Sequence, residues 1–297
     1  MYFRGFALIF SFLYVLAFSV ASVLIQKLYS SISPFFSLLI TAIIATVYFN
    51  LVNVGKLKKL YRDCWKEKKL WLAVMITILI MWNCTMNGPG LLGASFYTFL
   101  VFAWLGVLGY VSLGLKEKNK IALYTGVCIL VLIFVGIGLV FQSFSLKTAL
   151  GVVVGLIGGG SVFIYFKQSQ ALIKRVKLPP TQILAVRFYL TIIVLFIFVP
   201  KDSFSVYLNL DNVSYLVFLA FISLIIPLYF SQKALEHISS EQHAIINSLC
   251  PIFAAVLQEW FFRDLNWNFV FIYVLYSATI AGSYCMTRIQ KRKKSCA

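Results

Sequence analysis

Ten runs of mostly apolar residues divide this 297-residue chain, each about as long as a helix needs to cross a lipid bilayer. A helix rises 1.5 Å per residue, so about 20 residues span a hydrocarbon core of roughly 30 Å. Turn-forming residues mark several boundaries, and Gly88-Pro89-Gly90 is expected to separate the third run from the fourth. The runs predict membrane-spanning helices at residues 6–27, 34–52, 70–87, 93–113, 121–141, 149–172, 182–200, 213–235, 241–262 and 267–287.

The composition excludes a soluble protein of this size. Apolar residues make up 61% of the chain and charged residues 12%, whereas about 25% of an ordinary soluble domain is charged. The surplus apolar surface would have to face water, at a cost of about 25 cal/mol per Å². The same figures exclude disordered, coiled-coil and disulfide-rich chains. The sequence therefore predicts an all-α integral membrane protein.

The basic residues predict the orientation of the chain in the membrane. Lys and Arg number 26 against 9 acidic residues, which gives a net charge of +17. Most of them lie in alternate connections and at the two termini, with Arg4, seven in 53–69, three in 116–120, three in 174–177 and five in 288–294. Because short cytoplasmic loops are enriched in Lys and Arg, these connections and both termini are predicted to be cytoplasmic, with 88–92 and 201–212 outside. Two cytoplasmic termini require an even number of spans, and ten satisfies this.

Two segments of the chain resemble each other. Leu91–Glu117 and Ile238–Asp264 both contain 27 residues, open with small or polar residues and close on an acid. Five spans per half is an odd number, so the second half is predicted to be inverted relative to the first, which is a feature of transporters. The predicted units are residues 1–144, residues 145–290 and a basic cytoplasmic tail at 291–297. The basic charge of the tail could serve only to keep this end of the chain in the cytoplasm, or it could bind lipid head groups or nucleic acid.

Residues near the third and fourth spans of each half resemble the EamA-type proteins of the drug/metabolite transporter superfamily. In the second half the matching residues are Ala234, Leu235, Ser239, Ser240, Ala244, Pro251 and the acid Asp264, and in the first half Gly93, Ala94, Ser95 and Glu117. The chain departs from the family pattern at Trp104, which replaces a proline, and at Asp264, which replaces a glutamate. The resemblance implies two inverted five-helix repeats that form a metabolite transporter, such as an exporter of the bacterial inner membrane. It further implies that spans 1, 3, 4, 6, 8 and 9 surround a central cavity, with spans 2, 5, 7 and 10 outside.

Two charged residues within predicted spans of the inner group are the most informative, because a charge there costs about 2.5–3.5 kcal/mol on insertion scales. Lys167 is about five residues from the cytoplasmic end of its span, roughly 8 Å deep, and shares a face with Gln170. It could extend to the head groups, or it could be a cavity cation for a carboxylate or phosphate, since no carboxylate is expected at its depth. Glu259 lies near the outer end of its span and could carry a coupling proton or pair with Arg263.

Three further titratable residues are expected to lie outside the substrate-binding cavity. Arg187 is about one turn inside the cytoplasmic end of the seventh span, which the resemblance places outside the cavity, so its side chain is expected to extend to the head groups. His237 and His243 are expected to flank the connection between the eighth and ninth spans. Their spacing does not predict a metal site, and no cofactor is expected.

Aromatic and amide residues in the inner spans are the remaining candidates. Such a mixture suits a small amphipathic metabolite, although many aromatic residues could instead face lipid or fill the bundle. Tyr97 and Trp104 are predicted to share a face, as are Asn247 and Gln258. The candidate substrate-binding residues are Lys167, Trp82, Asn83, Tyr97, Trp104, Tyr165, Gln170, Tyr229, Asn247 and Gln258, with Glu259 as the candidate coupling residue and Gln232 as a further amide.

Three glycines at positions 151, 155 and 159 form a GxxxGxxxG pattern in the sixth span. This pattern predicts close packing of a neighbouring helix, or a flexible point during conformational change.

The sequence predicts a secondary transporter rather than an enzyme. It contains nine carboxylates and no GxSxG, HExxH or Walker motif. The predicted substrate is a small polar or amphipathic metabolite, anionic or zwitterionic such as an amino acid, moved by alternating access with possible proton coupling. A lipid bilayer is the expected partner, with no nucleic acid and no obligatory oligomer. The alternatives are a channel-like or scaffold membrane protein or, less favoured, a membrane-embedded enzyme.

Overall fold

The computed structural model describes residues 2–28, 31–141, 145–207, 209–263 and 267–295, and all regular structure in these ranges is helical. Asp264, which ends the second repeated segment, lies outside the described residues, as do the last two residues of the basic tail. The helices are α1 (Tyr2–Leu28), α2 (Pro34–Val52), the 3₁₀ turn η1 (Val54–Lys56), α3 (Leu57–Lys66), α4 (Lys68–Leu92), α5 (Ala94–Glu117), α6 (Lys120–Val140), α7 (Leu146–Val176), α8 (Pro180–Val186), α9 (Tyr189–Phe198), α10 (Asp202–Tyr207), α11 (Leu210–Leu219), the π-helical segment η3 (Ala220–Ile225), α12 (Ile226–Leu235), α13 (Ser240–Asn247), α14 (Cys250–Phe262) and α15 (Trp267–Ser295).

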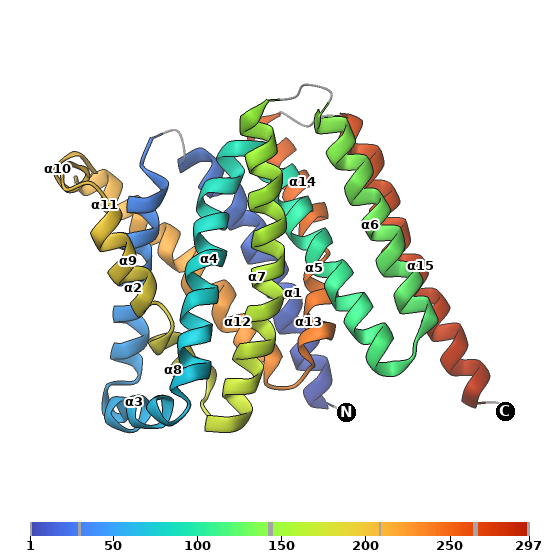
Figure 1. Cartoon of the computed structure of the whole chain (residues 1–297), viewed down its shortest axis with the longest axis horizontal. Coiled ribbons are helices and arrows are strands. Elements are labelled where there is room, and N and C mark those ends of the chain that lie inside the picture. Colours follow the sequence, from blue (N-terminus) through green and yellow to red (C-terminus); the bar gives the residue numbers. More distant parts are fainter. Residues whose placement is uncertain (1, 29–30, 142–144, 208, 264–266, 296–297) are drawn as a thin grey trace.

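The described residues contain ten spans that are long and apolar enough to cross a membrane. They are α1, α2, α4, α5, α6, α7, the pair α8–α9, the series α11–η3–α12, the pair α13–α14 and α15, and each overlaps one predicted span. Both ends of the chain lie on the same side of the bundle, as an even number of crossings requires (Figure 1). The prediction of an all-α, ten-span membrane fold is confirmed.

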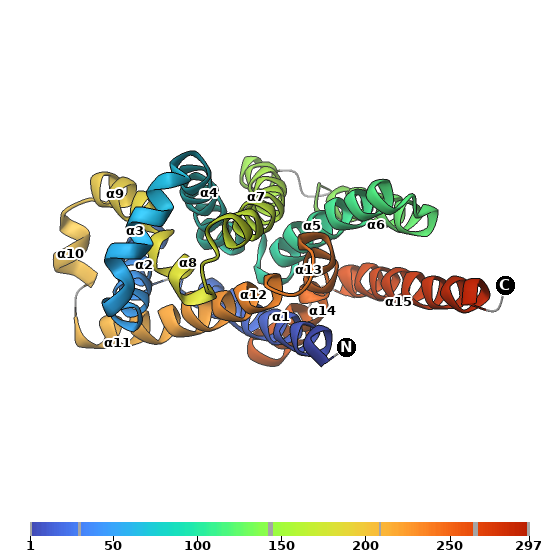
Figure 2. The ribbon, with the colours of Figure 1, turned by 90° about the horizontal axis from the view of Figure 1, so that it is seen from below.

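The bundle is elongated when it is seen along the helices (Figure 2). The helices α6 and α15 form one end, α2, α9 and α11 form the other, and α1, α5, α7 and α12 to α14 lie between them. Only 28% of the α6 span and 22% of the α15 span are buried, against 67% of α5. The fifth and tenth spans are therefore peripheral, as the resemblance implies. The second and seventh spans lie at the other end of the bundle but are each 50% buried, more than the fifth and tenth.

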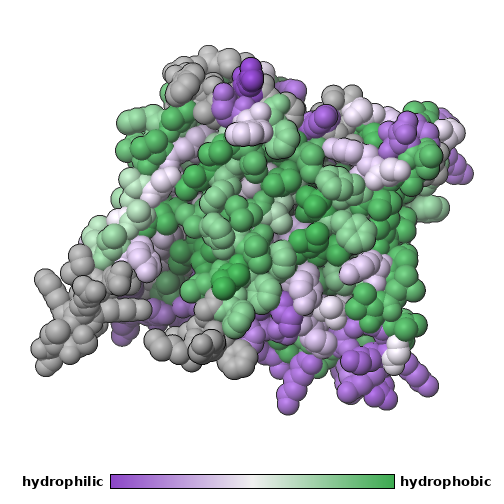
Figure 3. Space-filling view, turned by 180° about the vertical axis from the view of Figure 1, so that it is seen from behind, coloured by the Kyte–Doolittle hydropathy of each residue, from purple (hydrophilic) through white to green (hydrophobic). Residues whose placement is uncertain are grey.

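Apolar side chains, coloured green, cover the middle of the molecule, and hydrophilic side chains gather along its upper and lower edges, where the helices end (Figure 3). Many of the outward-facing apolar side chains are large, such as Phe134 at 65% and Phe198 at 77% exposure. A soluble protein would not expose so much apolar surface, whereas in a bilayer this surface meets lipid tails.

The basic segment between the second and third spans is helical, where the sequence analysis expected only a connection. In α3 the side chains of Leu60 and Cys64 are buried against the bundle, and Trp65 is 66% exposed. The exposed Asp63 carboxylate accepts a hydrogen bond from Lys66, which holds the pKa of Asp63 below its ordinary value. An amphipathic helix with a basic outer face and an aromatic residue suits the membrane–water interface.

The turn between α4 and α5 lies farther along the chain than predicted. Gly88-Pro89-Gly90 does not separate the two spans, because α4 continues through Pro89 to Leu92. The chain reverses at Gly93, which has a φ of +78° that other residues rarely adopt. The backbone N–H of Gly93 donates to the carbonyl of Pro89 at 2.8 Å, which closes the last turn of α4.

Distant side chains cap the start of α5. Ala94 N–H donates to Gln26 Oε1 at 2.7 Å, and Ser95 N–H donates to Gln258 Oε1 at 2.6 Å. The first amides of a helix have no partner within the helix, and at membrane depth they need one from elsewhere. These two amides therefore link α5 to α1 and α14.

Three spans are not continuous α-helices. The seventh is interrupted at Arg187 and Phe188, between α8 and α9, and the eighth contains the π-helical segment η3. The ninth is interrupted at Ser248 and Leu249, between α13 and α14. Asn247 and Gln258 are therefore on different helices, whereas the prediction placed them three turns apart on one continuous helix.

Side chains from two other helices accommodate the break in the seventh span. Asn50 of α2 donates to the carbonyl of Ala185 at 3.1 Å, and Trp71 of α4 donates to the carbonyl of Val186 at 2.8 Å. In a continuous helix the amides of Tyr189 and Leu190 would occupy these carbonyls. The two side chains satisfy carbonyls that would otherwise be unpaired away from water.

Replacing Trp71 by phenylalanine should destabilise the break, because it removes the indole donor and keeps the ring. A buried acceptor that loses its partner costs about 1–3 kcal/mol. We expect a lower unfolding temperature in detergent and faster amide exchange around residues 187–190. Trp65→Phe, on the exposed face of α3, is the matched control. Equal unfolding temperatures for the two variants would contradict this role for Trp71.

The glycine pattern on α7 lies against α4 and α5. A Cβ at Gly151 would meet the side chain of Leu92, and one at Gly155 would meet Leu100 at 3.0 Å. A Cβ at Gly159 would overlap the backbone carbonyl oxygen of Val101. The glycines let the helices approach, and the packing interpretation of the pattern is confirmed.

Candidate substrate-binding site

Arg187 lies in the interior of the bundle, at the interruption of the seventh span. Its side chain is fully buried, with 0% exposure. The expectation that it extends to the head groups is wrong. Most of α8 is buried, and Arg187 follows it directly at the break, whereas much of α9 is exposed. Of the Lys and Arg side chains that the structure describes, this is the one that is buried.

A short chain of polar groups holds the guanidinium on one side. Nη1 of Arg187 donates to the hydroxyl oxygen of Tyr165 at 2.7 Å, and Nε2 of Gln232 donates to the same oxygen at 2.8 Å. The carbonyl oxygen of Gln232 accepts from the hydroxyl of Ser169 at 2.7 Å. The ring of Phe188 lies 4.5 Å from the guanidinium carbon. Tyr165 and Gln232 come from the sixth and eighth spans, so three spans converge on one cation.

The opposite side of the guanidinium has no partner. Nε and Nη2 of Arg187 are buried, and neither makes a hydrogen bond in the described structure. These two N–H groups lie on one edge of the planar group, with the spacing of the two oxygens of a carboxylate. A buried cation with unsatisfied donors is costly, unless a ligand supplies the missing acceptors and charge.

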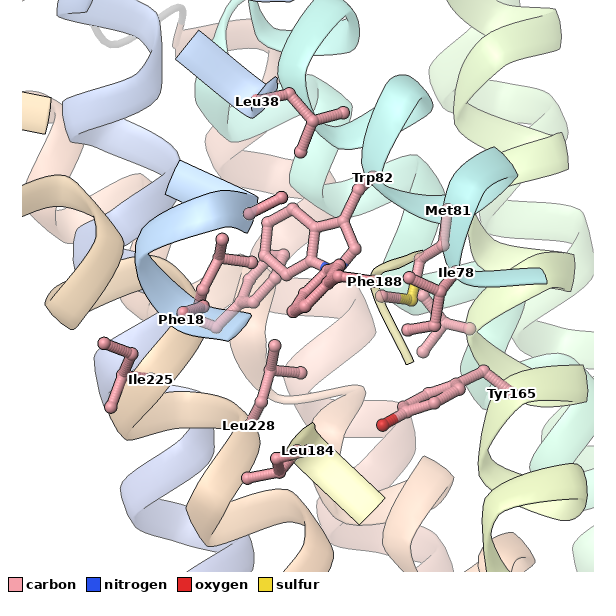
Figure 4. Close-up of a cluster of buried hydrophobic side chains, with 14 of the residues drawn as sticks. Phe18, Leu38, Ile78, Met81, Trp82, Tyr165, Leu184, Phe188, Ile225 and Leu228 are labelled. Carbon is pink, nitrogen blue, oxygen red and sulfur yellow. The ribbon is translucent and has the colours of Figure 1, made fainter. Parts of the chain in front are cut away.

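Tyr165 and Phe188, which contact the guanidinium, belong to a large cluster of buried aromatic and aliphatic side chains. The same cluster contains Trp82, Phe18 and Leu228 (Figure 4). Trp82 is fully buried, and its indole N–H has no partner. The centre of the bundle thus combines one cation, one free indole donor and large apolar surfaces. None of Trp82, Tyr165 and Arg187 is exposed, so this structure is closed around them.

His243 is also in the interior, whereas the sequence analysis placed it beside a cytoplasmic connection. It is fully buried. Its Nδ1 lies 2.9 Å from the hydroxyl of Ser11, and its Nε2 lies 2.9 Å from the hydroxyl of Ser231 and 3.1 Å from Nδ2 of Asn247. The error arose because α13 begins at Ser240 and carries His243 one turn into the bundle.

The carboxylate of Glu241 interacts electrostatically with Lys167, contrary to the expectation that no carboxylate is available to this lysine. Lys167 is exposed, donates to the hydroxyl of Ser112 at 3.2 Å, and lies 4.5 Å from the ring centre of Phe163. The buried carboxylate of Glu241 lies 4.0 Å from the amine of Lys116 and is also close enough to be influenced by Lys167. Lys167 therefore does not need a substrate to supply its counter-charge, although its predicted contact with substrate stays a prediction.

Several other candidates support helix connections or packing. Gln170 donates to the carbonyls of Leu235 and Ile238 at 3.2 and 2.7 Å, and so holds the connection between α12 and α13. Gln258 caps α5, as described above. Asn83 donates to the carbonyl of Leu79 in its own helix at 2.7 Å.

The remaining candidates lie around the glycine face of α7 or farther out. The ring of Trp104 packs at Gly159, and the hydroxyl of Tyr97 lies beside Gly158, so both residues face α7 and share one face of α5, as the spacing predicts. Tyr229 on α12 is half-buried. Glu259 is exposed on α14, where it lines a groove between α14 and α15. Their predicted roles in substrate binding and coupling stay predictions.

Comparison with known proteins gives a fold for the chain and a family match for its second half. Residues 146–286 match the model of the EamA-like transporter family. A solved crystal structure superposes on the chain with a TM-score of 0.67 and 13% sequence identity, covering 94% of this chain and 96% of the other. At that identity the likeness establishes the fold alone. No curated protein sequence matches the chain. With its ten apolar spans, the chain is a multi-pass membrane protein, and its residues 146–286 are similar to the EamA-like transporter family.

Proposed function

We propose that this protein is a carrier that moves a small organic anion or zwitterion by alternating access, and that Arg187 binds the negative group of the substrate. The observation that carries the proposal is the free Nε–Nη2 edge of a fully buried guanidinium. Nothing in the packing of the seventh span requires a cation at this position, because its neighbours are mostly apolar. A cation kept at such cost is typical of a binding site.

The position of Arg187 supports a transport role. Substrate sites of many carriers lie where spanning helices are interrupted, because unpaired backbone groups and mobile joints are available there. Arg187 is at such an interruption, and its partners Tyr165 and Gln232 lie on α7 and α12. A carrier whose site is closed in this structure must open it to each side of the membrane in turn. The predicted inverted halves would provide two equivalent ways of opening.

Uptake and counterflow measurements in proteoliposomes test the proposal. The full chain should give saturable uptake of an organic anion, and preloading the vesicles with unlabelled substrate should accelerate uptake. Linear flux without counterflow would indicate a channel, and absence of flux from a folded protein would indicate a scaffold. Chemical conversion of the solute would indicate an enzyme. Repeating the assay with and without a pH gradient tests proton coupling, for which Glu259 stays the candidate.

Labelling of introduced cysteines tests the orientation. In a background without the native cysteines, Asn209→Cys should react with an impermeant thiol reagent applied from outside. Lys58→Cys, exposed on α3, should react only after permeabilisation. Asn209 follows α10, near the top of Figure 1, and Lys58 lies in α3, at the bottom, so the two positions are on opposite faces of the membrane-spanning bundle. The reverse pattern would overturn the prediction that both termini are cytoplasmic.

A further inference from the structure

The charges buried in the bundle limit the charge that a ligand can carry. In the described part of the chain, Arg187 and Glu241 are the Lys, Arg, Asp and Glu residues that are buried. Glu241 lies at the start of α13, 4.0 Å from the amine of Lys116 and under the influence of Lys167, so its charge is already compensated. With the Asn247 amide oriented as in the structure, its Nδ2 donates to Nε2 of His243. Nε2 is then an acceptor, and the imidazole ring carries no charge. One positive charge at Arg187 is left to be balanced.

The geometry at Arg187 provides for one carboxylate. Nη1 donates one of its N–H groups to Tyr165, and Nε and Nη2, which present two parallel N–H groups on one edge, make no hydrogen bond in the described structure. Two parallel N–H groups pair with two oxygens of one group. The hydroxyl of Tyr165 accepts two hydrogen bonds, so its own proton is left to donate. A dianion such as a phosphate monoester would bring a second negative charge for which the described core offers no second cation.

A ligand ammonium has no counter-charge in this core. The face of Phe188 is already taken by the guanidinium itself. An ammonium close to Arg187 would be repelled, and one farther away would lose its water without gaining a carboxylate. This disfavours the zwitterionic alternative, to which amino acids belong.

The surroundings suit an apolar ligand body. Trp82, Phe18 and Leu228 are buried in the cluster that contains Tyr165 and Phe188 (Figure 4). Rings and aliphatic chains pack on such surfaces, and the free indole N–H of Trp82 can satisfy one polar acceptor on the ligand.

We infer that the site at Arg187 selects a monocarboxylate with a flat apolar body and discriminates against the corresponding α-amino acid, amine and phosphate monoester. This inference rests on the proposed function, since it specifies the ligand of the same site. The selection follows from one unbalanced cation with one free carboxylate-binding edge, enclosed by aromatic side chains.

Binding of four related probes to the purified full chain tests the inference. The probes are 3-phenylpropionate, phenylalanine, 2-phenylethylamine and phenyl phosphate, which share a phenyl ring and differ in charge. Isothermal titration calorimetry should show 3-phenylpropionate binding at least about tenfold more tightly than the other three. Arg187→Gln should remove this preference. Lys147→Gln, at the exposed start of α7, should keep it.

The outcomes separate the inference from the proposed function. Tightest binding of phenylalanine, or equal binding of phenyl phosphate, that depends on Arg187 would overturn the inference and leave the anion site intact. The same affinities in the wild type and Arg187→Gln would overturn both. No binding of 3-phenylpropionate at millimolar concentration by a protein that unfolds cooperatively would also overturn the inference.

Discussion

Arg187→Gln is expected to abolish saturable transport while raising the thermal stability of the protein. Glutamine keeps a hydrogen-bond donor near Tyr165 but removes the charge, and a charged hydrogen bond contributes about 1.5–3 kcal/mol. Affinity for the substrate should fall about tenfold to 150-fold. The folded protein loses an unpaired buried cation, so its unfolding temperature in detergent should rise by several degrees. Arg187→Lys should retain part of the transport activity, because lysine keeps the positive charge but lacks the two parallel N–H donors of the guanidinium.

These opposite changes distinguish a binding residue from a structural one. If Arg187 served only to hold α7, α8 and α12 together through Tyr165, its replacement would lower stability, and transport would fall only with the amount of folded protein. Transport per folded molecule that remains near the wild-type value in Arg187→Gln would refute the assignment. Normalising transport rates to the monodisperse fraction in size-exclusion chromatography separates the two cases.

Gly159→Leu is expected to prevent assembly of the bundle. A Cβ at this position would overlap the backbone oxygen of Val101, and a backbone cannot move aside as a flexible side chain can. Overpacking a core usually costs about 1–3 kcal/mol, and a rigid obstacle places this substitution at or above that range. We expect loss of the monodisperse protein and a lower unfolding temperature for any that remains.

Gly138→Leu on α6 is the matched control, because a Cβ there has no atom within 4 Å. It makes the same glycine-to-leucine change in a helix, at a position where the new side chain meets open space. Its elution profile and unfolding temperature should match those of the wild type. Equal behaviour of Gly159→Leu and Gly138→Leu would show that the close approach of α7 and α5 is not required.

The ten spans could be predicted from the sequence because the bilayer imposes a length and a composition on each helix independently of its neighbours. The glycine face of α7 could be predicted for a similar reason, since the pattern lies within one helix. The end of α4 could not, because whether Pro89 ends a helix depends on what satisfies the backbone around it. In this fold Gln26 and Gln258, from distant parts of the chain, cap the next helix and let the turn form at Gly93.

The candidate site was only partly predictable. Trp82 and Tyr165 were identified because large amphipathic residues in an apolar span are conspicuous. Arg187 was noticed but assigned to the surface, since the sequence does not show that the seventh span breaks there. The break depends on Asn50 and Trp71, which are 135 and 115 residues away from the carbonyls that they bind. The influence of Glu241 on Lys167 could not be predicted either, because that carboxylate comes from another span.

The central claim is that Arg187 pairs directly with a carboxylate of the substrate. A thermodynamic cycle measures this pairing, using two proteins, the wild type and Arg187→Gln, and two ligands, 3-phenylpropionate and its carboxamide. Calorimetry on the four combinations gives the coupling between the side chain and the ligand charge, free of effects that either change has alone. We predict a coupling of about 1.5–3 kcal/mol, in which the carboxylate loses its advantage over the amide only when Arg187 is replaced. A coupling of zero, with the carboxylate and the amide affected equally by the substitution, would contradict the account.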